Sequence, residues 1–146
     1  MYLNQTTEYA LRTSACLARQ APARTRAEDL AAIAGVPRPY ASKILRRLTM
    51  AGLLTSRKGR GGGFVLARRP EEIRFVDVMR AMDFEPAADH CLFGWESCDS
   101  QSPCPLHPLW SELKESIEDW ARNSTLADLR RTVEDTLRSP VVAPAP

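Results

Sequence analysis

The sequence predicts a mainly α-helical fold with a small β-hairpin wing, that is, a winged helix-turn-helix followed by a long dimerisation helix. Three observations lead to this fold class. Apolar residues recur with helical spacing over residues 8–51, a glycine-rich run lies between two short apolar runs, and a heptad seam begins at residue 106. A chain of 146 residues has room for one ordinary domain and such an appendage.

Helical patterns open the chain. Residues 8–19 carry one apolar face, which predicts a first helix. Thr25, with Glu28 three residues later, has the spacing of a capping box and predicts the start of a second helix, which Gly35 ends. A third helix is expected over residues 38–51, where apolar residues recur every three to four positions. Two helices joined by a tight turn are typical of a helix-turn-helix.

A basic glycine-rich run follows these helices. Residues 53–57 and 64–67 are suited to two short strands, and residues 58–63 between them read Lys-Gly-Arg-Gly-Gly-Gly. Glycines allow positive φ and a close approach to a groove, so this run predicts a wing. The competing interpretation is a nucleotide phosphate loop, but the glycines lack the Lys-Ser/Thr ending of a Walker motif and no long helix follows them.

The charge of the chain is divided between its halves. Residues 1–74 hold 14 Lys and Arg against 5 Asp and Glu, a net of +9, whereas residues 75–146 hold 6 against 13, a net of −7. A localised positive surface is the electrostatic footprint of phosphate binding, and an acidic half would repel DNA. The basic half therefore predicts binding to double-stranded DNA.

The third predicted helix and the wing supply the candidate DNA contacts. Recognition helices point their first residues at base edges, and long basic side chains on a wing can reach phosphates or a narrow minor groove. The candidates are Arg38, Tyr40, Ser42, Lys43, Arg57, Lys58 and Arg60. Tyr40 is also a candidate core aromatic, and Arg46 and Arg47 are candidates for contact with phosphate or water only.

A heptad seam lies in the acidic half, beyond another apolar helix expected at residues 75–82. The seam residues are Leu106, Trp110, Leu113, Ile117 and Trp120, spaced 4, 3, 4 and 3, on a helix that we expect to begin near Pro108. A long helix beyond a small winged module exposes this seam unless a second subunit covers it. We therefore expect a homodimer that presents two recognition helices to a pseudo-palindromic operator.

Three cysteines and a histidine lie between these two helices, in the pattern Cys91-x6-Cys98-x5-Cys104-x2-His107. Thiolates select iron-sulfur clusters or zinc, and a loop can wrap several ligands around one centre. Zinc ligands usually come as closely spaced cysteine pairs, which favours the cluster, although structural zinc on three cysteines and a histidine stays open. Cys16 stands apart in an apolar helical run and is expected to be a buried free thiol.

Several classes of protein do not fit. The chain has two histidines and lacks a Ser/His/Asp arrangement, a paired-carboxylate motif or a nucleotide fingerprint, so we do not expect an enzyme. No run of about 18 apolar residues and no signal-peptide pattern occurs, so we expect no membrane association and a cytoplasmic protein.

Over nearly all its length the chain resembles the bacterial winged-helix regulators that include IscR, NsrR and RirA. The matching features are the Thr7-Glu8-Tyr9-Ala10 run, the Gly35-Val36 turn, Ala51-Gly52-Leu53, the wing at residues 57–63, and the run at residues 125–129. The resemblance implies an iron-sulfur cluster on Cys91, Cys98 and Cys104, ahead of the dimerisation helix. Six residues separate the first two cysteines, where several members have five.

The resemblance offers two fourth ligands. His107 lies where the IscR-like branch places a histidine. Glu8 lies where nitric-oxide and redox sensors of the family supply a carboxylate from the first helix, and either the same subunit or the other subunit of a dimer could provide it. We favour a [2Fe-2S] cluster with His107 over a [4Fe-4S] cluster, and expect it to sense redox state, nitric oxide, or iron or cluster status. The alternative is a zinc-stabilised DNA-binding dimer that senses nothing. The expected regions are a DNA-binding domain at residues 1–74, a cluster loop and dimerisation helix at 75–137, and a disordered tail at 138–146.

Overall fold

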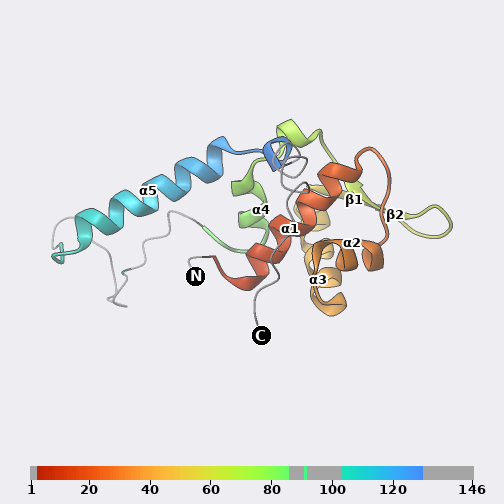
Figure 1. Cartoon of the computed structure of the whole chain (residues 1–146), viewed down its shortest axis with the longest axis horizontal. Helices are drawn as coiled ribbons and strands as arrows, with labels where there is room; N and C mark the ends of the chain where they lie inside the picture. Colours follow the sequence, from red (N-terminus) through yellow and green to blue (C-terminus); the bar gives the residue numbers. More distant parts are fainter. Residues whose placement is uncertain (1–2, 86–90, 92–102, 130–146) are drawn as a thin grey trace, which may run out of the picture.

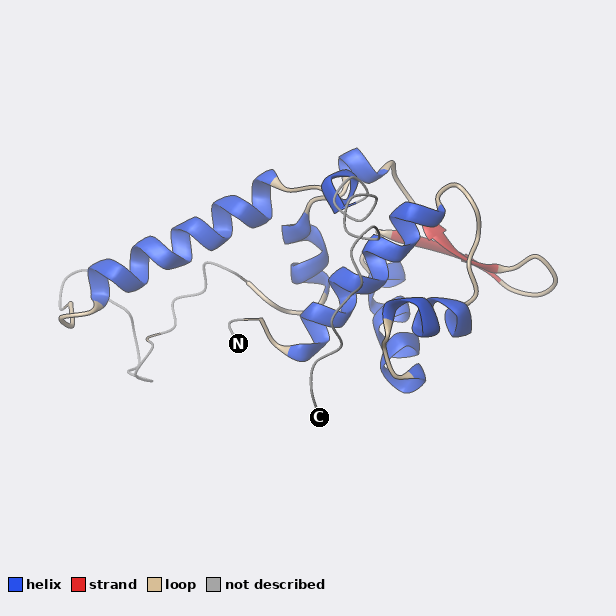
Figure 2. Ribbon diagram, in the orientation of Figure 1, coloured by secondary structure: helices blue, strands red, loops and turns tan. Residues whose placement is uncertain are grey.

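The computed structural model describes residues 3–85, 91 and 103–129 of the chain. These residues form helices and one two-stranded hairpin, so the predicted fold class is confirmed (Figures 1 and 2). In chain order the elements are α1 (Gln5–Gln20), α2 (Ala27–Ala34), α3 (Arg38–Met50), β1 (Leu54–Arg57), β2 (Gly63–Leu66), the 3-10 turn η1 (Pro70–Glu72), α4 (Phe75–Ala81) and α5 (His107–Asn123).

Helix α1 begins three residues earlier than the apolar pattern predicts. The side chain of Asn4 accepts a hydrogen bond from the backbone N–H of Thr7 at 2.9 Å, which satisfies one of the unpaired donors of the first turn. Ala10, Leu17 and Ala18 lie on the buried face of the helix. This face packs against α2, α3 and α4, so α1 lies at the centre of the molecule.

Helices α2 and α3 form the predicted helix-turn-helix. Gly35 ends α2 in the left-handed conformation (φ 63°), which lets its N–H bond back to α2. The capping box expected at Thr25 and Glu28 is wrong. The helix begins at Ala27 with Arg26 at the N-cap, and the Arg26 side chain makes no cap hydrogen bond. Thr25 pairs with the wing instead.

The wing is an antiparallel hairpin whose register sets Leu54 opposite Leu66 and Arg57 opposite Gly63. Thr25 adds an isolated antiparallel bridge to β2. Its N–H donates to the carbonyl of Phe64 at 3.0 Å, and its carbonyl accepts from the N–H of Phe64 at 2.8 Å. The loop between α1 and α2 is thereby attached to the beginning of β2, next to the wing tip.

A single hydrophobic core runs through both halves of the chain. It joins the helix-turn-helix to α4 and to the segment after α5, where Leu126 is fully buried. That segment returns to the start of α4, because the Phe75 N–H donates to the Ser124 carbonyl at 3.0 Å and the Leu126 N–H donates to the Ile73 carbonyl at 2.9 Å. Helix α5 itself projects from this body, and its beginning is the end farthest from the wing (Figure 1).

Candidate nucleic-acid interface and metal ligands

The exposed face of α3 carries the predicted base-contacting residues. The side chains exposed on this face are those of Arg38, Tyr40, Ser42 and Lys43. Ala41, which lies between them in the sequence, is buried in the core. Fully buried Ile44, Leu45 and Leu48 fasten the opposite face of the helix to the body. A rigidly held helix with a polar and basic outer face can enter a major groove.

Tyr40 is partly a packing residue. The residue is 46% exposed, and its ring meets the ring of Tyr9 on α1 edge to face, with centroids 5.9 Å apart. The hydroxyl of Tyr9 accepts a hydrogen bond from Gln5, and the Arg12 guanidinium lies 5.9 Å from the centre of the Tyr9 ring. The recognition helix is thus supported at its N-terminal end by α1, while Tyr40 remains open to a ligand.

The wing tip exposes Arg57, Lys58 and Arg60, the other predicted DNA contacts. Its shape requires glycine at two positions. A Cβ atom at Gly62 would lie 2.4 Å from the carbonyl oxygen of Arg57, and one at Gly63 would lie 2.6 Å from the carbonyl oxygen of Thr25. Both distances are far below van der Waals contact, so the backbone fills the space that a side chain would need.

Of the predicted metal ligands, Cys91, Cys104, His107 and Glu8 are described, and Cys98 lies outside the described residues. Cys104 and His107 share one turn at the start of α5, where the His107 N–H donates to the Cys104 carbonyl at 2.9 Å. The imidazole Nε2 lies 3.5 Å from the Ser111 hydroxyl. Cys91 is half-buried and carries a free thiol, as does Cys104.

Glu8 has a different environment. Its carboxylate pairs with Arg12 one turn further along α1. The beginning of α1 and the beginning of α5 are well separated (Figure 1). Within residues 3–85, 91 and 103–129, no three donors of the His, Cys, Asp or Glu type gather into a group that could hold a metal ion.

Comparison with known proteins decides the family. The Rrf2 family, described as iron-dependent transcriptional regulators, matches residues 3–132. A protein of Aquifex aeolicus (strain VF5) classed among HTH-type transcriptional regulators is 32% identical over 131 residues, which cover 88% of this chain and 91% of that protein.

This chain belongs to the Rrf2 family. IscR of Pectobacterium atrosepticum is 35% identical over 101 residues, which cover 69% of this Rrf2 chain and 61% of IscR, less than two thirds of that relative. Two solved structures share the fold. CymR of B. subtilis, described as a global cysteine regulator, has a TM-score of 0.76 at 21% identity over 89% of this chain and 96% of its own. IscR of T. potens has a TM-score of 0.72 at 23% identity over 97% and 93%.

Kinship with transcriptional regulators confirms that this Rrf2 protein is a regulator and not an enzyme. No helix among its described residues is long and apolar enough to cross a membrane. Cys16 is half-buried, and burial raises the pKa of its thiol although nearby Arg19 opposes the shift. A protonated thiol is a poor nucleophile and a poor metal ligand, so Cys16 is an inert part of the packing.

One basic residue of α3 has a role that the sequence did not reveal. The Arg47 Nε donates to the carbonyl of Ala81 at 3.0 Å, and its guanidinium also pairs with Asp83. Asp83 follows α4 in the left-handed conformation (φ 56°). Arg47 therefore holds the end of α4 against the recognition helix, whereas Arg46 is exposed. The partner lies 34 residues away in sequence, and spacing along the chain gives no signal of such a contact.

Proposed function

We propose that this Rrf2-family regulator is a homodimer whose binding to a DNA operator is controlled by an iron-sulfur cluster on its cysteine loop. The observation that carries the proposal is the turn at the start of α5, which places a thiol at Cys104 and an imidazole at His107 three residues apart and closed by a hydrogen bond. Soft thiolates with an imidazole are a donor set that iron-sulfur centres use.

The proposed ligands are Cys91, Cys98 and Cys104 with His107, and the proposed centre is [2Fe-2S] in preference to [4Fe-4S]. Glu8 is the alternative fourth ligand. The ion pair with Arg12 supports His107, because ligation by Glu8 would require that pair to open. Separation of α1 from the start of α5 further implies that a Glu8 ligand would come from the other subunit. A bound cluster would supply an iron centre sensitive to redox state and to nitric oxide.

For DNA, the proposed contacts are those of α3 and the wing: Arg38, Tyr40, Ser42, Lys43, Arg57, Lys58 and Arg60. Residues 1–74 are proposed as the DNA-binding region and 75–137 as the cluster loop and dimerisation region, although the hydrophobic core extends across their boundary. The tail at 138–146 lies outside the described residues. A two-fold dimer would match a pseudo-palindromic operator.

Helix α5 supports the homodimer. Its seam residues Leu106, Leu113 and Trp120 are 42%, 48% and 44% exposed, and Leu109 beside them is 68% exposed. Large apolar side chains in a row on a projecting helix are costly in water and fit a second copy of the same helix.

Anaerobic purification, followed by a visible absorption spectrum and iron, sulfide and zinc analysis, tests the proposed centre. Brown protein with matching iron and sulfide supports the cluster, and the iron count separates two-iron from four-iron. Colourless protein with stoichiometric zinc would establish the alternative, a zinc-stabilised DNA-binding dimer without sensing.

Variants identify the ligands and the control. We expect Cys98→Ala to abolish the chromophore and change operator affinity, while Cys16→Ala, the matched control outside the loop, keeps both. His107→Ala should shift the spectrum and weaken retention of iron, and Glu8→Gln should leave both unchanged. The reverse pattern in the last two variants would assign the fourth ligand to Glu8. Unchanged operator affinity on cluster loss would overturn the proposed control.

A further inference from the structure

Three arginines meet at Gly63, at the start of β2. Arg57 is its partner in the hairpin ladder. Arg24, from the loop between α1 and α2, directs its guanidinium to the Gly63 carbonyl, with Nη1 at 3.4 Å. Arg26, from the same loop, has its backbone nitrogen 3.2 Å from where a Cβ atom of Gly63 would lie. Two of the three come from a segment that neither the helix-turn-helix nor the wing motif includes.

The bridge between Thr25 and Phe64 fixes this arrangement. Its two backbone hydrogen bonds, of 3.0 and 2.8 Å, continue the antiparallel sheet by one residue beyond the hairpin. Phe64 packs against the core, and side chains alternate between the faces of a sheet. The neighbours of this row, Arg57, Gly63 and Arg26, therefore belong to the opposite, outward face, and Arg57 and Arg26 are both exposed.

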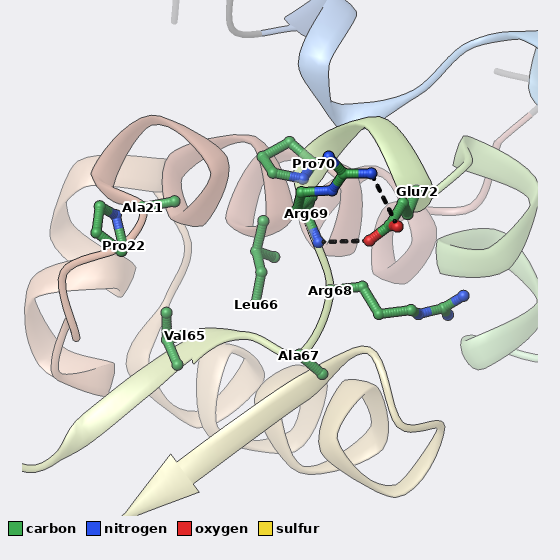
Figure 3. A pocket seen from close by; sticks show the side chains of 9 residues that line it. All are labelled: Ala21, Pro22, Val65, Leu66, Ala67, Arg68, Arg69, Pro70 and Glu72. Atoms are coloured by element: carbon green, nitrogen blue, oxygen red, sulfur yellow. Dashed lines mark hydrogen bonds and ion pairs between the residues drawn. The ribbon is translucent and has the colours of Figure 1, made fainter.

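The rest of the loop lies along the base of the wing. Ala21 and Pro22 face Val65 and Leu66 across a hollow of about 550 Å³ that η1 closes on the other side (Figure 3). Arg69 at this hollow is paired with Glu72 at 3.2 Å and is thus already neutralised. By contrast, Arg24, Arg26 and Arg57 form no ion pair with any carboxylate among the described residues. The carboxylate of Glu28, two residues after Arg26, lies 4.0 Å from Arg38 instead.

Such a cluster is unfavourable for the folded protein alone. Arg57 and Arg26 belong to the two segments that flank β2 and lie on the same outward face, where their like charges repel each other. An arginine is also a poor residue at a helix N-cap, where its positive charge lies at the positive end of the helix dipole and its side chain accepts no hydrogen bond. Residues that break local rules without compensation are expected at functional sites, and a phosphate would supply the compensation here.

We infer that Arg24 and Arg26 extend the wing into a clamp for the DNA backbone, with Arg57 on the other side of Gly63. The missing side chain of Gly63 lets the backbone at Thr25 and Arg26 lie close against the start of β2, which brings Arg24 and Arg26 to the strand that pairs with Arg57. This inference rests on the proposed DNA binding and adds to it a segment outside the predicted contacts. The loop would hold the wing in place and contact DNA as well.

The test measures binding of the full-length protein to mixed-sequence double-stranded DNA over a range of salt concentrations. Each phosphate contact removed lowers the slope of log affinity against log salt by about 0.9. We expect Arg24→Gln and Arg26→Gln each to lower the slope by about that amount per contact. Lys58→Gln, at the wing tip, is the positive control, and Arg19→Gln, an exposed arginine at the end of α1, should leave the slope unchanged.

Arg26→Ser separates DNA contact from structure. A serine at the N-cap accepts a helix N–H that arginine leaves unpaired, so the variant should melt at a higher temperature and yet bind DNA more weakly. Unchanged slopes in all the Arg24 and Arg26 variants, with a reduced slope in Lys58→Gln, would overturn the clamp and leave the proposed DNA binding standing. Wild-type protein without salt-dependent binding would overturn both.

Discussion

Gly63 is the residue at which three segments of the chain meet. It begins β2, faces Arg57 across the hairpin, and touches the backbone of the loop at Thr25 and Arg26. With φ at 130°, it also has a backbone conformation that residues with side chains rarely adopt. Position 63 therefore combines two independent demands for glycine, one conformational and one steric.

We expect Gly63→Ala to lower the free energy of unfolding by about 1–3 kcal/mol, because the new methyl group would force the loop from the wing and the backbone would remain strained. Gly61→Ala is the matched control at the wing tip. Gly61 also has positive φ but has open space where its Cβ would lie, so its substitution should cost less. Chemical denaturation of both variants measures the difference, and an equal loss would show that contact with Thr25 has no stabilising role.

The Glu85 carboxylate predicts a pH dependence at a single residue. Its two oxygens accept hydrogen bonds of 2.9 Å from Arg80, and this pairing holds the pKa of Glu85 below its ordinary value. The stability from the pair is present above the ordinary carboxyl pKa and is lost as pH falls through the lowered pKa of the folded state. Both side chains are more than a third exposed, so the contribution is small. An NMR titration should show the pKa of Glu85 rising in Arg80→Gln, and an unmoved titration would contradict this cause.

At the scale of elements, the Arg47 side chain joins α3 to the end of α4. Arg47 bonds the Ala81 carbonyl and pairs with Asp83, just ahead of the segment that leads to Cys91. A movement of Asp83, at the start of the segment that leads to the cysteine loop, would therefore act directly on the recognition helix through Arg47. Arg46, the preceding residue, is exposed to solvent and takes no part in this contact.

Substitution of Arg47 tests this joint. Arg47→Ala should lower the free energy of unfolding by about 1 kcal/mol, since it leaves the Ala81 carbonyl without its donor. Arg46→Ala, one residue earlier and exposed, should change it by less than about 0.5 kcal/mol. Thermal or urea unfolding measures both, and equal effects would mean that the joint adds no stability.

Most elements could be predicted from the sequence, because apolar periodicity and the glycines that end helices are signals contained within a short stretch of the chain. The helices over residues 38–51 and 75–82 were expected within a residue of their observed ends. The start of α2 was predicted wrongly, since the Thr25 and Glu28 spacing fits a capping box while Thr25 is committed to a strand partner 39 residues away. The Arg47 joint and the arginines at Gly63 also depend on tertiary contacts, which local patterns do not contain. The predicted metal ligands and DNA contacts stay predictions.

For the whole molecule, the exposed seam of α5 predicts the homodimer that we propose. Leu113→Gln should shift the purified protein toward monomer and weaken binding to a two-site operator, because the two recognition helices would no longer be held together. Glu115→Gln, an exposed residue off the seam on the same helix, creates the same side chain and should leave the dimer intact. Sedimentation velocity measures the assembly state. A dimer in Leu113→Gln that is as stable as the wild type would refute the role of the seam.

The return of the chain after α5 has a consequence for protein synthesis. Leu126 enters the core beside Ile73, and Ser124 and Leu126 complete backbone hydrogen bonds with residues about fifty positions earlier. Residues 124–129 are synthesised after the predicted DNA-binding region. The core of that region therefore stays incompletely packed until almost all of the described chain has left the ribosome. A chain truncated before this segment would contain the recognition helix but would lack part of its core. We expect such a chain to be degraded by proteases and not to act as a shortened regulator.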